Sequence, residues 1–273
     1  MGTSDKTEVR GQRSEVRDQT DAGGRLTSDL RPLISLLAVA CCLLAFCAPA
    51  QSRRFLLLSQ QAPATSGTAN VTNGLIGWWK LDDGSGSTAS DSSGNALNGM
   101  LTNSPTWTSG LLNGAMSFAS ASQVIGIPAH NYGSSLSVCA WVQLSSYLPG
   151  YQRIFDTDYR YGYFLGFAVD GRTGLFIVAN PSIGTCSGGM ATNGQWSHLC
   201  GTFDGSSGLL YFNGSLVASN AFTAPTQGSV GAQIAHSVSD NDTRSLAGLL
   251  DDVRVYNRAL SSNEVKIIYN WRP

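Results

Sequence analysis

From Gly74 onward, short apolar runs alternate with clusters of Gly, Asn, Asp and Ser, and this pattern limits the possible folds most strongly. Asp170-Gly171, Asp204-Gly205 and Asn213-Gly214 are dipeptides typical of tight hairpin turns. Strands are expected over 75–81, 114–118, 122–127, 135–144, 153–157, 163–170, 174–180, 196–204, 208–214, 215–220 and 248–256. Many short strands separated by turns predict an all-β protein built as a two-sheet antiparallel sandwich.

One short helix is expected at the C-terminal end. Ser261 and Glu264 have the spacing of a capping box, in which the serine caps the first turn and the glutamate reaches back to it. Charged residues make up only 13% of the chain and the net charge is −1. This balance argues against a nucleic-acid partner, because no basic surface is available.

A hydrophobic run from Pro32 to Ala50 predicts export. It ends in Ala48-Pro49-Ala50, a pattern that a signal peptidase accepts. The run is shorter than the about 20 residues that a spanning helix needs. Because Arg53 and Arg54 follow, an uncleaved N-terminal anchor is the alternative. The protein is therefore expected to be secreted or held at the cell surface, with a membrane as partner only if this segment stays uncleaved.

The remaining N-terminal sequence divides into two further segments. Residues 1–31 carry mixed charges and read as a disordered lead, or as the result of a start codon placed too far upstream. Residues 51–73 become rich in Ala, Thr and Ser and read as a linker. Residues 74–273 then form the single expected domain.

Six sequence motifs in a fixed order identify a likeness to a known family. They are GLIGWWKLDDGSGSTASDSSGNALNG, GAMSF, SLSVCAWV, GQWSHLCGTFDG, LLYFNGSLV and LLDDVRVYNRALSSNEV. Together they resemble the laminin-G-like jelly-roll modules of the concanavalin A-like lectin/glucanase superfamily. The resemblance implies a jelly-roll sandwich that binds carbohydrate or glycoprotein without catalysis. A structural or adhesion domain that lacks a saccharide site is the alternative, held at the cell surface by the uncleaved N-terminal helix.

Asp251 is the residue that the strand pattern accommodates least easily. Counted by twos, it is in phase with Leu249, Val253 and Val255, which are expected to face the core. An unpaired carboxylate in the core would cost roughly several kcal/mol or would have to be protonated. The position therefore calls for a cation or a basic partner.

The resemblance implies that partner, because such modules often carry a structural calcium between an N-terminal Asp/Asn-rich loop and the last strand. Calcium takes six to eight oxygen ligands. Asp91, Asn95 and Asp251 are the expected ligands, with Asp82 or Asp83 as additions. In the alternative, Asp91 only caps an Asx-turn and Asp251 pairs with Arg254 or Arg258.

Three cysteines lie outside the hydrophobic run, so one disulfide at most forms within a monomer. Cys139 and Cys200 have sequence contexts like those of the disulfide in pentraxins, which belong to the same superfamily. The resemblance implies a Cys139–Cys200 bond and a free Cys186; two buried free thiols are the alternative. The pentraxin double-calcium site requires a Glu-Gln-Asp run, which is missing here, so pentraxin ligand binding does not carry over.

Catalysis by the glycosidase route is not expected. Glycosidases of this fold use paired carboxylates, with two glutamates on one strand. The glutamates of this chain are Glu8, Glu15 and Glu264, and Glu264 is assigned to the helix cap. No G-x-S-x-G, H-E-x-x-H or C-x-x-C motif is present.

A tyrosine-rich segment, 147–164, is the leading candidate for ligand binding. It contributes Tyr151 and Tyr159, with Asp156 and Asp158 as polar neighbours. Exposed aromatic rings with polar neighbours suit saccharides, although alternate tyrosines also pack on sandwiches. Trp107, expected in a loop, is the further candidate.

Overall fold

The computed structural model describes residues 70–148, 150–158, 160–180, 182–226, 228–238 and 245–273. The predicted lead, signal segment and nearly all of the predicted linker lie outside these residues. In the described part of the chain, no helix is long and apolar enough to cross a bilayer.

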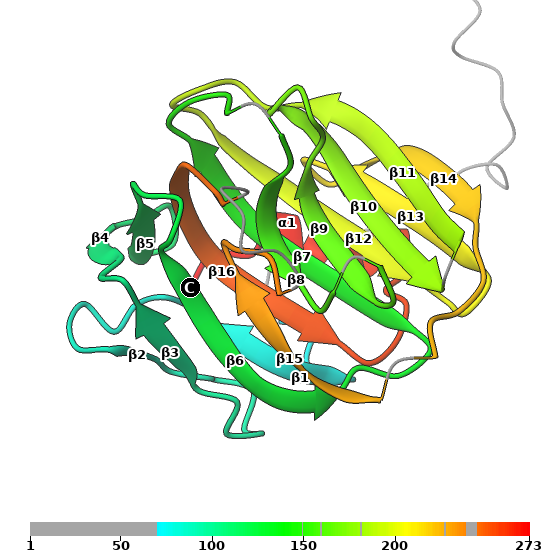
Figure 1. Cartoon of the computed structure of the whole chain (residues 1–273), viewed down its shortest axis with the longest axis horizontal. Coiled ribbons are helices and arrows are strands. Elements are labelled where there is room, and N and C mark those ends of the chain that lie inside the picture. Colours follow the sequence, from blue (N-terminus) through cyan, green and yellow to red (C-terminus); the bar gives the residue numbers. More distant parts are fainter. Residues whose placement is uncertain (1–69, 149, 159, 181, 227, 239–244) are drawn as a thin grey trace, which may run out of the picture. The chain divides into compact units, whose positions relative to one another are not determined.

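Two antiparallel sheets face each other, as Figure 1 shows. In spatial order, the first sheet contains β14 (Ser215–Ala221), β13 (Ser207–Phe212), β12 (Trp196–Phe203), β7 (Leu136–Leu144), β16 (Gly248–Tyr256), β5 (Gly114–Phe118) and β4 (Thr106–Ser109), and β1 (Leu75–Trp79) also pairs with β16. The second sheet contains β11 (Ser182–Met190), β10 (Thr173–Asn180), β9 (Tyr163–Phe167), β8 (Gln152–Asp156), β15 (Ser229–Ile234), β6 (Val124–Asn131), β3 (Gly99–Thr102) and β2 (Thr88–Ala89). The expected all-β, two-sheet jelly-roll sandwich is confirmed.

Five strands were not expected from the sequence, namely β2, β3, β4, β11 and β15. The sequence of β11, SIGTCSGGM, is rich in Gly and Ser, which are depleted in strands. Its pairing with β10 holds it in the sheet despite that composition. The short strands β2 and β3 pair with each other over two residue pairs, too few for a clear alternation.

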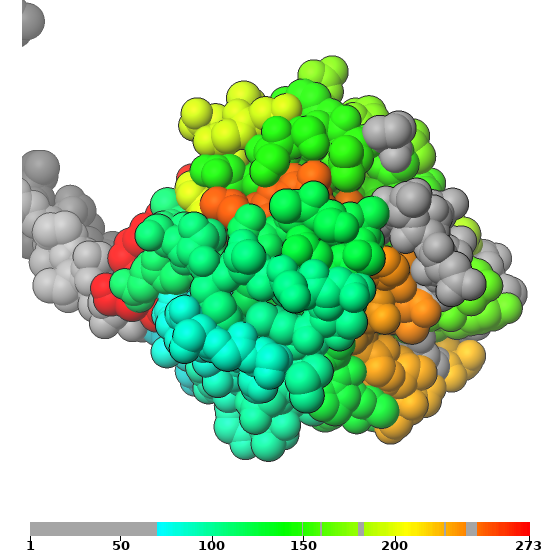
Figure 2. Space-filling view, turned by 60° about the vertical axis from the view of Figure 1, so that its left-hand side comes forward, coloured from blue at the N-terminus to red at the C-terminus, as the bar shows by residue number. Residues whose placement is uncertain are grey.

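β16 is central to the first sheet because it pairs with β7 on one side and with both β5 and β1 on the other. The first strand of the domain therefore lies beside the last one. Figure 2 shows that early residues of the domain, in cyan and teal, lie on the same face of the domain as later residues in orange.

The expected alternation along β16 is wrong at its start, because a β-bulge interrupts the strand. The pairing with β7 shifts between Asp251 and Arg254, and Asp252 has a positive φ of 54°. Leu250 faces the core before the bulge, and Val253 does so after it. Asp251 therefore points to the outer side of the sheet, although it is completely buried.

A second, smaller core lies on that outer side. The helix α1 (Ser262–Asn270) contributes Val265 and Ile268 to it. Val71, from the segment assigned to the linker, packs in the same cluster, and its carbonyl accepts a hydrogen bond from Tyr256. The helix thus covers the first sheet rather than extending from it.

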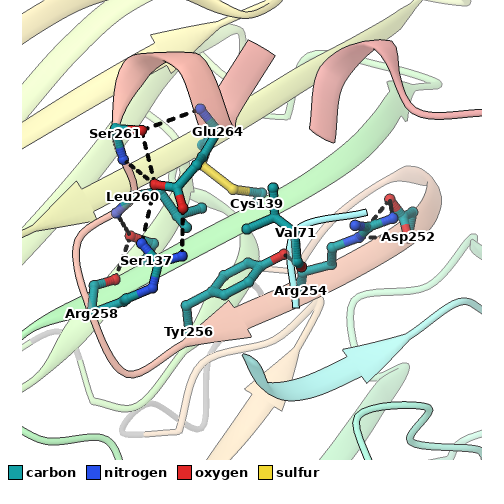
Figure 3. Close-up of a disulfide and its surroundings, with 11 residues drawn as sticks. Val71, Ser137, Cys139, Asp252, Arg254, Tyr256, Arg258, Leu260, Ser261 and Glu264 are labelled. Carbon is teal, nitrogen blue, oxygen red and sulfur yellow. Dashed lines mark hydrogen bonds and ion pairs between the residues drawn. A yellow bond between two sulfur atoms is a disulfide. The ribbon is translucent and has the colours of Figure 1, made fainter. Parts of the chain in front are cut away.

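The disulfide Cys139–Cys200 lies beneath this helix (Figure 3), which confirms the expected pairing. The two cysteines are direct partners across β7 and β12, with Cα atoms 4.0 Å apart. Cys186 is free, as expected. It is buried in the main core, and burial raises the pKa of its thiol to about 11.

The capping box at the start of α1 is confirmed and provides a test of the helix. Ser261 Oγ accepts from the Glu264 backbone N–H, and Glu264 Oε2 accepts from the Ser261 N–H. Ser261→Ala should lower the free energy of unfolding by about 0.5–2 kcal/mol, measured by urea denaturation. Ser262→Ala, one residue further on, is the matched control and should change it little. Equal losses in both variants would contradict a specific capping role.

Candidate functional site

Asp251 has one satisfied oxygen and one orphaned oxygen. Its Oδ2 accepts hydrogen bonds from the backbone N–H groups of Leu111 (2.8 Å) and Leu112 (2.7 Å). Its Oδ1 is buried and has no hydrogen-bond partner in the described part of the chain. Buried polar atoms are normally paired, so this oxygen marks a place where a donor or a cation is missing.

Two glycines allow the chain to pack closely beside this carboxylate. A Cβ atom on Gly110 would lie 2.5 Å from Asp251 Oδ2, and it would overlap the Gly114 carbonyl oxygen. A Cβ atom on Gly114 would lie 2.6 Å from the Leu81 carbonyl oxygen and 3.1 Å from Asp82 Oδ1. The Gly110–Gly114 turn therefore packs closely against Asp251 and Asp82, and Asp82 Oδ1 accepts a hydrogen bond from the Gly114 N–H at 2.7 Å.

The electrostatics of this position are unfavourable for the protein alone. Burial raises the pKa of Asp251 to about 7, with the charges of Asp252 and Asp82 acting in the same direction. The two backbone N–H donors oppose the shift only in part. A bound cation would reverse this balance by favouring the charged form.

Neither basic residue considered as a partner for Asp251 takes that role. Arg254 pairs with Asp252, with NH2 3.0 Å from Oδ2, and Arg258 pairs with Glu264 at 2.6 Å. The bulge explains the first pairing, because it turns Asp252 to the same side of the sheet as Arg254.

Asp91 is fully occupied by hydrogen bonds from the protein. Its Oδ1 accepts from the backbone N–H groups of Trp78 and Ser93, and its Oδ2 accepts from the Ser93 hydroxyl and the Leu97 N–H. Asn95 Nδ2 donates to the Ile76 carbonyl at 3.2 Å. Both residues organise the loop that joins β2 to β3 and hold it against β1.

The remaining acidic candidate, Asp83 in the loop between β1 and β2, accepts a hydrogen bond from the Ser90 N–H at 3.2 Å. Among the described residues, no group of three or more His, Cys, Asp or Glu side chains forms a metal cluster. A cation at Asp251 would therefore draw on backbone carbonyl oxygens as well as carboxylates.

Tyr151 lines a cavity of about 180 Å³ on the outer face of the second sheet. Leu175 and Ile177 of β10 lie in its floor, and Val169 and Ile183 also line it. Leu175 and Ile177 are buried, whereas Val169 and Ile183 are 61% and 54% exposed. The cavity is thus an apolar depression with exposed apolar side chains at its mouth.

The residues around Tyr151 were only partly foreseen. The run LFIVA (175–179) of β10 is apolar throughout, with Phe176 and Val178 in the main core and Leu175 and Ile177 on the other side. A strand that is apolar on both sides needs cover on both sides. The apolar run in the sequence therefore indicates that the outer face of β10 is covered as well as the inner one.

The two aspartates of the tyrosine-rich segment hold the local structure together. Asp156 is completely buried and lies 2.6 Å from Arg153 NH1, and burial raises its pKa to about 6 while Arg153 opposes the rise. Asp158 is half-buried, and its Oδ1 accepts from the Arg160 N–H. Tyr159 lies outside the described residues.

Trp107 lies in β4, so the expectation of a loop is wrong. It pairs with Met116 of β5, and the ring packs against the main core. Its Nε1 donates to the Gly86 carbonyl at 3.1 Å. Pairing with β5 holds a segment whose sequence, with Pro105 and two glycines nearby, reads as a turn.

The two-sheet antiparallel jelly-roll sandwich is an architecture of lectin-like domains. A laminin G model, described as the concanavalin A-like lectin/glucanases superfamily, matches residues 118–266, more than half of the chain. The chain belongs to this superfamily. No curated protein sequence matches it significantly.

Solved structures with the same fold come from several kinds of protein. Domain 4 of AbnA, an extracellular arabinanase of Geobacillus stearothermophilus solved with arabinotriose, is 20% identical with a TM-score of 0.56; the match covers 72% of this chain and 98% of that one. The binding domain of Paraclostridial Mosquitocidal Protein 1 is 14% identical (TM-score 0.59; 73% and 52% covered). Trypanosoma rangeli sialidase is 15% identical (TM-score 0.57; 72% and 32% covered). The chain thus spans about half of the second protein and a third of the third.

Proposed function

We propose that this protein is a non-catalytic module that binds carbohydrate or glycoprotein through the outer face of the second sheet. The observation that carries the proposal is the Tyr151 cavity, a depression open to an exterior sheet face and edged by an aromatic ring. Aromatic and apolar side chains pack against the C–H faces of sugars, while concave sites of this kind bury part of a ligand.

The comparisons support this assignment by analogy. The arabinanase domain was solved with arabinotriose, and the mosquitocidal neighbour is a binding domain. Neighbours also include a sialidase, so the non-catalytic role rests on the residues of this chain. Its last glutamate, Glu264, is held by Arg258 and Ser261 in the helix cap, which leaves no pair of glutamates for glycoside hydrolysis.

A structural calcium is part of the proposal, centred on Asp251 rather than on Asp91. The orphaned, buried Oδ1 of Asp251 fits a hard cation, and the charge of the nearby Asp82 raises the pKa of Asp251, which a cation would offset. Asp91 fits less well because four protein donors already use its oxygens. The ion would neutralise the carboxylates and tie the β4–β5 turn to β16.

We further propose that the protein acts outside the cytoplasm, secreted or at the cell surface. The Cys139–Cys200 disulfide supports this location, because disulfides persist in oxidising compartments. The hydrophobic segment before Ala50 supports it as well.

Tyr151→Ala tests the binding face. The protein should be retarded in gels that contain a polysaccharide, with arabinan, xylan and galactan as the first panel, and the variant should lose about tenfold or more in affinity. Tyr161→Ala removes a tyrosine that is 54% exposed and outside the cavity, and it should bind as the wild type does. Unchanged binding by Tyr151→Ala would place the saccharide elsewhere on the protein.

A further inference from the structure

The chemistry of the Tyr151 cavity is more specific than saccharide binding requires. Among the described residues, the side chains that line it are uncharged, and only those of Tyr151 and Thr185 carry a polar atom. The other lining side chains, such as Leu175 and Ile177, are aliphatic. A group that enters the cavity therefore exchanges water for an almost wholly apolar surface.

An unmodified sugar ring is a poor occupant of such a cavity. Each buried hydroxyl without a hydrogen-bond partner carries a desolvation penalty. Two side-chain hydroxyls cannot satisfy the several hydroxyls of a pyranose or furanose ring. The sugar ring itself is better placed at the mouth of the cavity, where water remains available.

The size of the cavity also indicates that it holds only a part of a ligand. Sites that enclose a whole small molecule usually measure about 300–1,000 Å³. The cavity here is about 180 Å³, which equals the space of roughly six waters at about 30 Å³ each. One compact group fits it, such as an acyl chain or an aromatic ring.

We propose that the Tyr151 cavity takes an apolar substituent of a saccharide, that is, an acyl ester or an aryl group attached to a sugar. This proposal rests on the saccharide-binding function proposed above and narrows its ligand class. The substituent fills the cavity between Tyr151 and the β10 side chains, while the sugar lies across the exposed side chains of Val169 and Ile183.

A peptide is disfavoured as the occupant by the hydrogen bonding of the cavity floor. β9 pairs with both β8 and β10, and β10 pairs with both β9 and β11. Their backbone groups are used within the sheet and cannot pair with an added strand. A compact group presented from outside the sheet needs no such pairing.

The test is a titration of the full chain, labelled at isoleucine methyl groups, with two matched probes followed by NMR. Phenyl β-D-glucoside carries an aryl group, and methyl β-D-glucoside does not. The methyl signals of Ile177 and Ile183 should shift with the phenyl probe and stay in place with the methyl probe. Ile76 and Ile154, which lie in the main core, serve as internal references.

Ala168→Leu is the variant that tests occupation directly, because Ala168 lines the cavity and a larger side chain fills it. The response to the phenyl probe should fall at least tenfold. Ala129 is an exposed residue of β6 in the same sheet. Ala129→Leu therefore makes the same chemical change away from the cavity and should leave the response to the phenyl probe intact. Equal responses in both variants would overturn the proposal.

The ligand class is then tested with acetylated xylan and the same xylan after alkaline deacetylation. Tighter binding of the acetylated form, lost in Ala168→Leu, is the expected result. If polysaccharides bind but the cavity methyl groups respond to neither probe, the substituent proposal fails while the binding function stands. If the methyl groups respond but no polysaccharide binds, the saccharide function fails, and an apolar peptide side chain replaces the sugar substituent as occupant.

Discussion

Replacing Arg254 with methionine is expected to lower the free energy of unfolding by about 3–5 kcal/mol, because the change leaves a buried carboxylate without its cation. Arg254 is completely buried, and its Nε lies 3.0 Å from both carboxylate oxygens of Asp252 (Figure 3). Asp252 is also buried, and within the described part of the chain it would keep one partner, the Trp78 Nε1 at 2.6 Å.

The guanidinium of Arg254 also joins parts of the chain that are far apart in sequence. It lies 4.5 Å from the ring centroids of both Trp78 and Trp271, between the first strand and the C-terminal tail. It donates as well to Asn70 at the start of the described domain. Stacking on the two rings adds to the ion pair, so methionine replaces the volume but not these contacts.

A double-mutant cycle separates the ion pair from packing. Asp252→Asn keeps a residue that tolerates the positive φ of the bulge, and combined with Arg254→Met it removes both charges together. The double variant should be more stable than Arg254→Met alone by at least about 1 kcal/mol. Arg172→Met, at an exposed arginine, is the control and should stay within about 0.5 kcal/mol of the wild type. A small loss in Arg254→Met, or strict additivity, would contradict this account.

Asp251→Asn should stabilise the protein in EDTA at pH 8 and remove its response to calcium. The folded-state pKa of about 7 lies above the unfolded value near 3.8, so the folded protein prefers the protonated acid. Stability from this group is therefore complete below pH about 4 and is lost as the pH rises through 7. The difference between these two pKa values corresponds to a loss of up to about 4 kcal/mol at pH 8, and the neutral asparagine avoids this loss.

Calcium should act in the opposite direction because it favours the charged carboxylate. At a concentration 100 times its dissociation constant, the ion stabilises the fold by about 2.7 kcal/mol, or roughly 5–10 °C in Tm for a domain of this size. The gain should be larger at pH 8 than at pH 5. Thermal melts with EDTA and with millimolar calcium measure it, with Asp158→Asn as a control that keeps the response. Coincident melts at pH 8 would exclude the cation at Asp251.

Local sequence patterns predicted the elements of the fold well where alternation and turn residues agreed. Asn213-Gly214 has positive φ at both residues, as its hairpin requires. The capping box of α1 is present as its spacing indicated. The hairpin turn and the capping box both depend on residues close in sequence, so contacts with distant parts of the chain did not change either of them. The disulfide was foreseen through a family likeness instead.

The bulge in β16 could not be read from the sequence. Counting by twos assumes an uninterrupted ladder, and one extra residue at Asp252 reverses the face of everything before it. The prediction that Asp251 is buried is confirmed, but its side chain lies on the outer face of the first sheet, where the turn at Leu111 and Leu112 covers it. The same long-range contact supplies its partners, which no local pattern indicates.

The candidate ligand residues show a similar division. Tyr151 could be named from the density of tyrosines, but its apolar neighbours Leu175 and Ile183 come from strands far along the chain. Asp156 looked like a surface residue because it is charged, whereas Arg153, three residues earlier, neutralises it in a buried pair. Whether a charge is exposed depends on that pairing, which composition alone does not specify.

A crystal structure of the protein with the saccharide that binds it best would test the central claim most directly. The account predicts saccharide density on the outer face of the second sheet, against Tyr151 and above β10. Density confined to another face of the sandwich, with the Tyr151 cavity filled only by water, would contradict it.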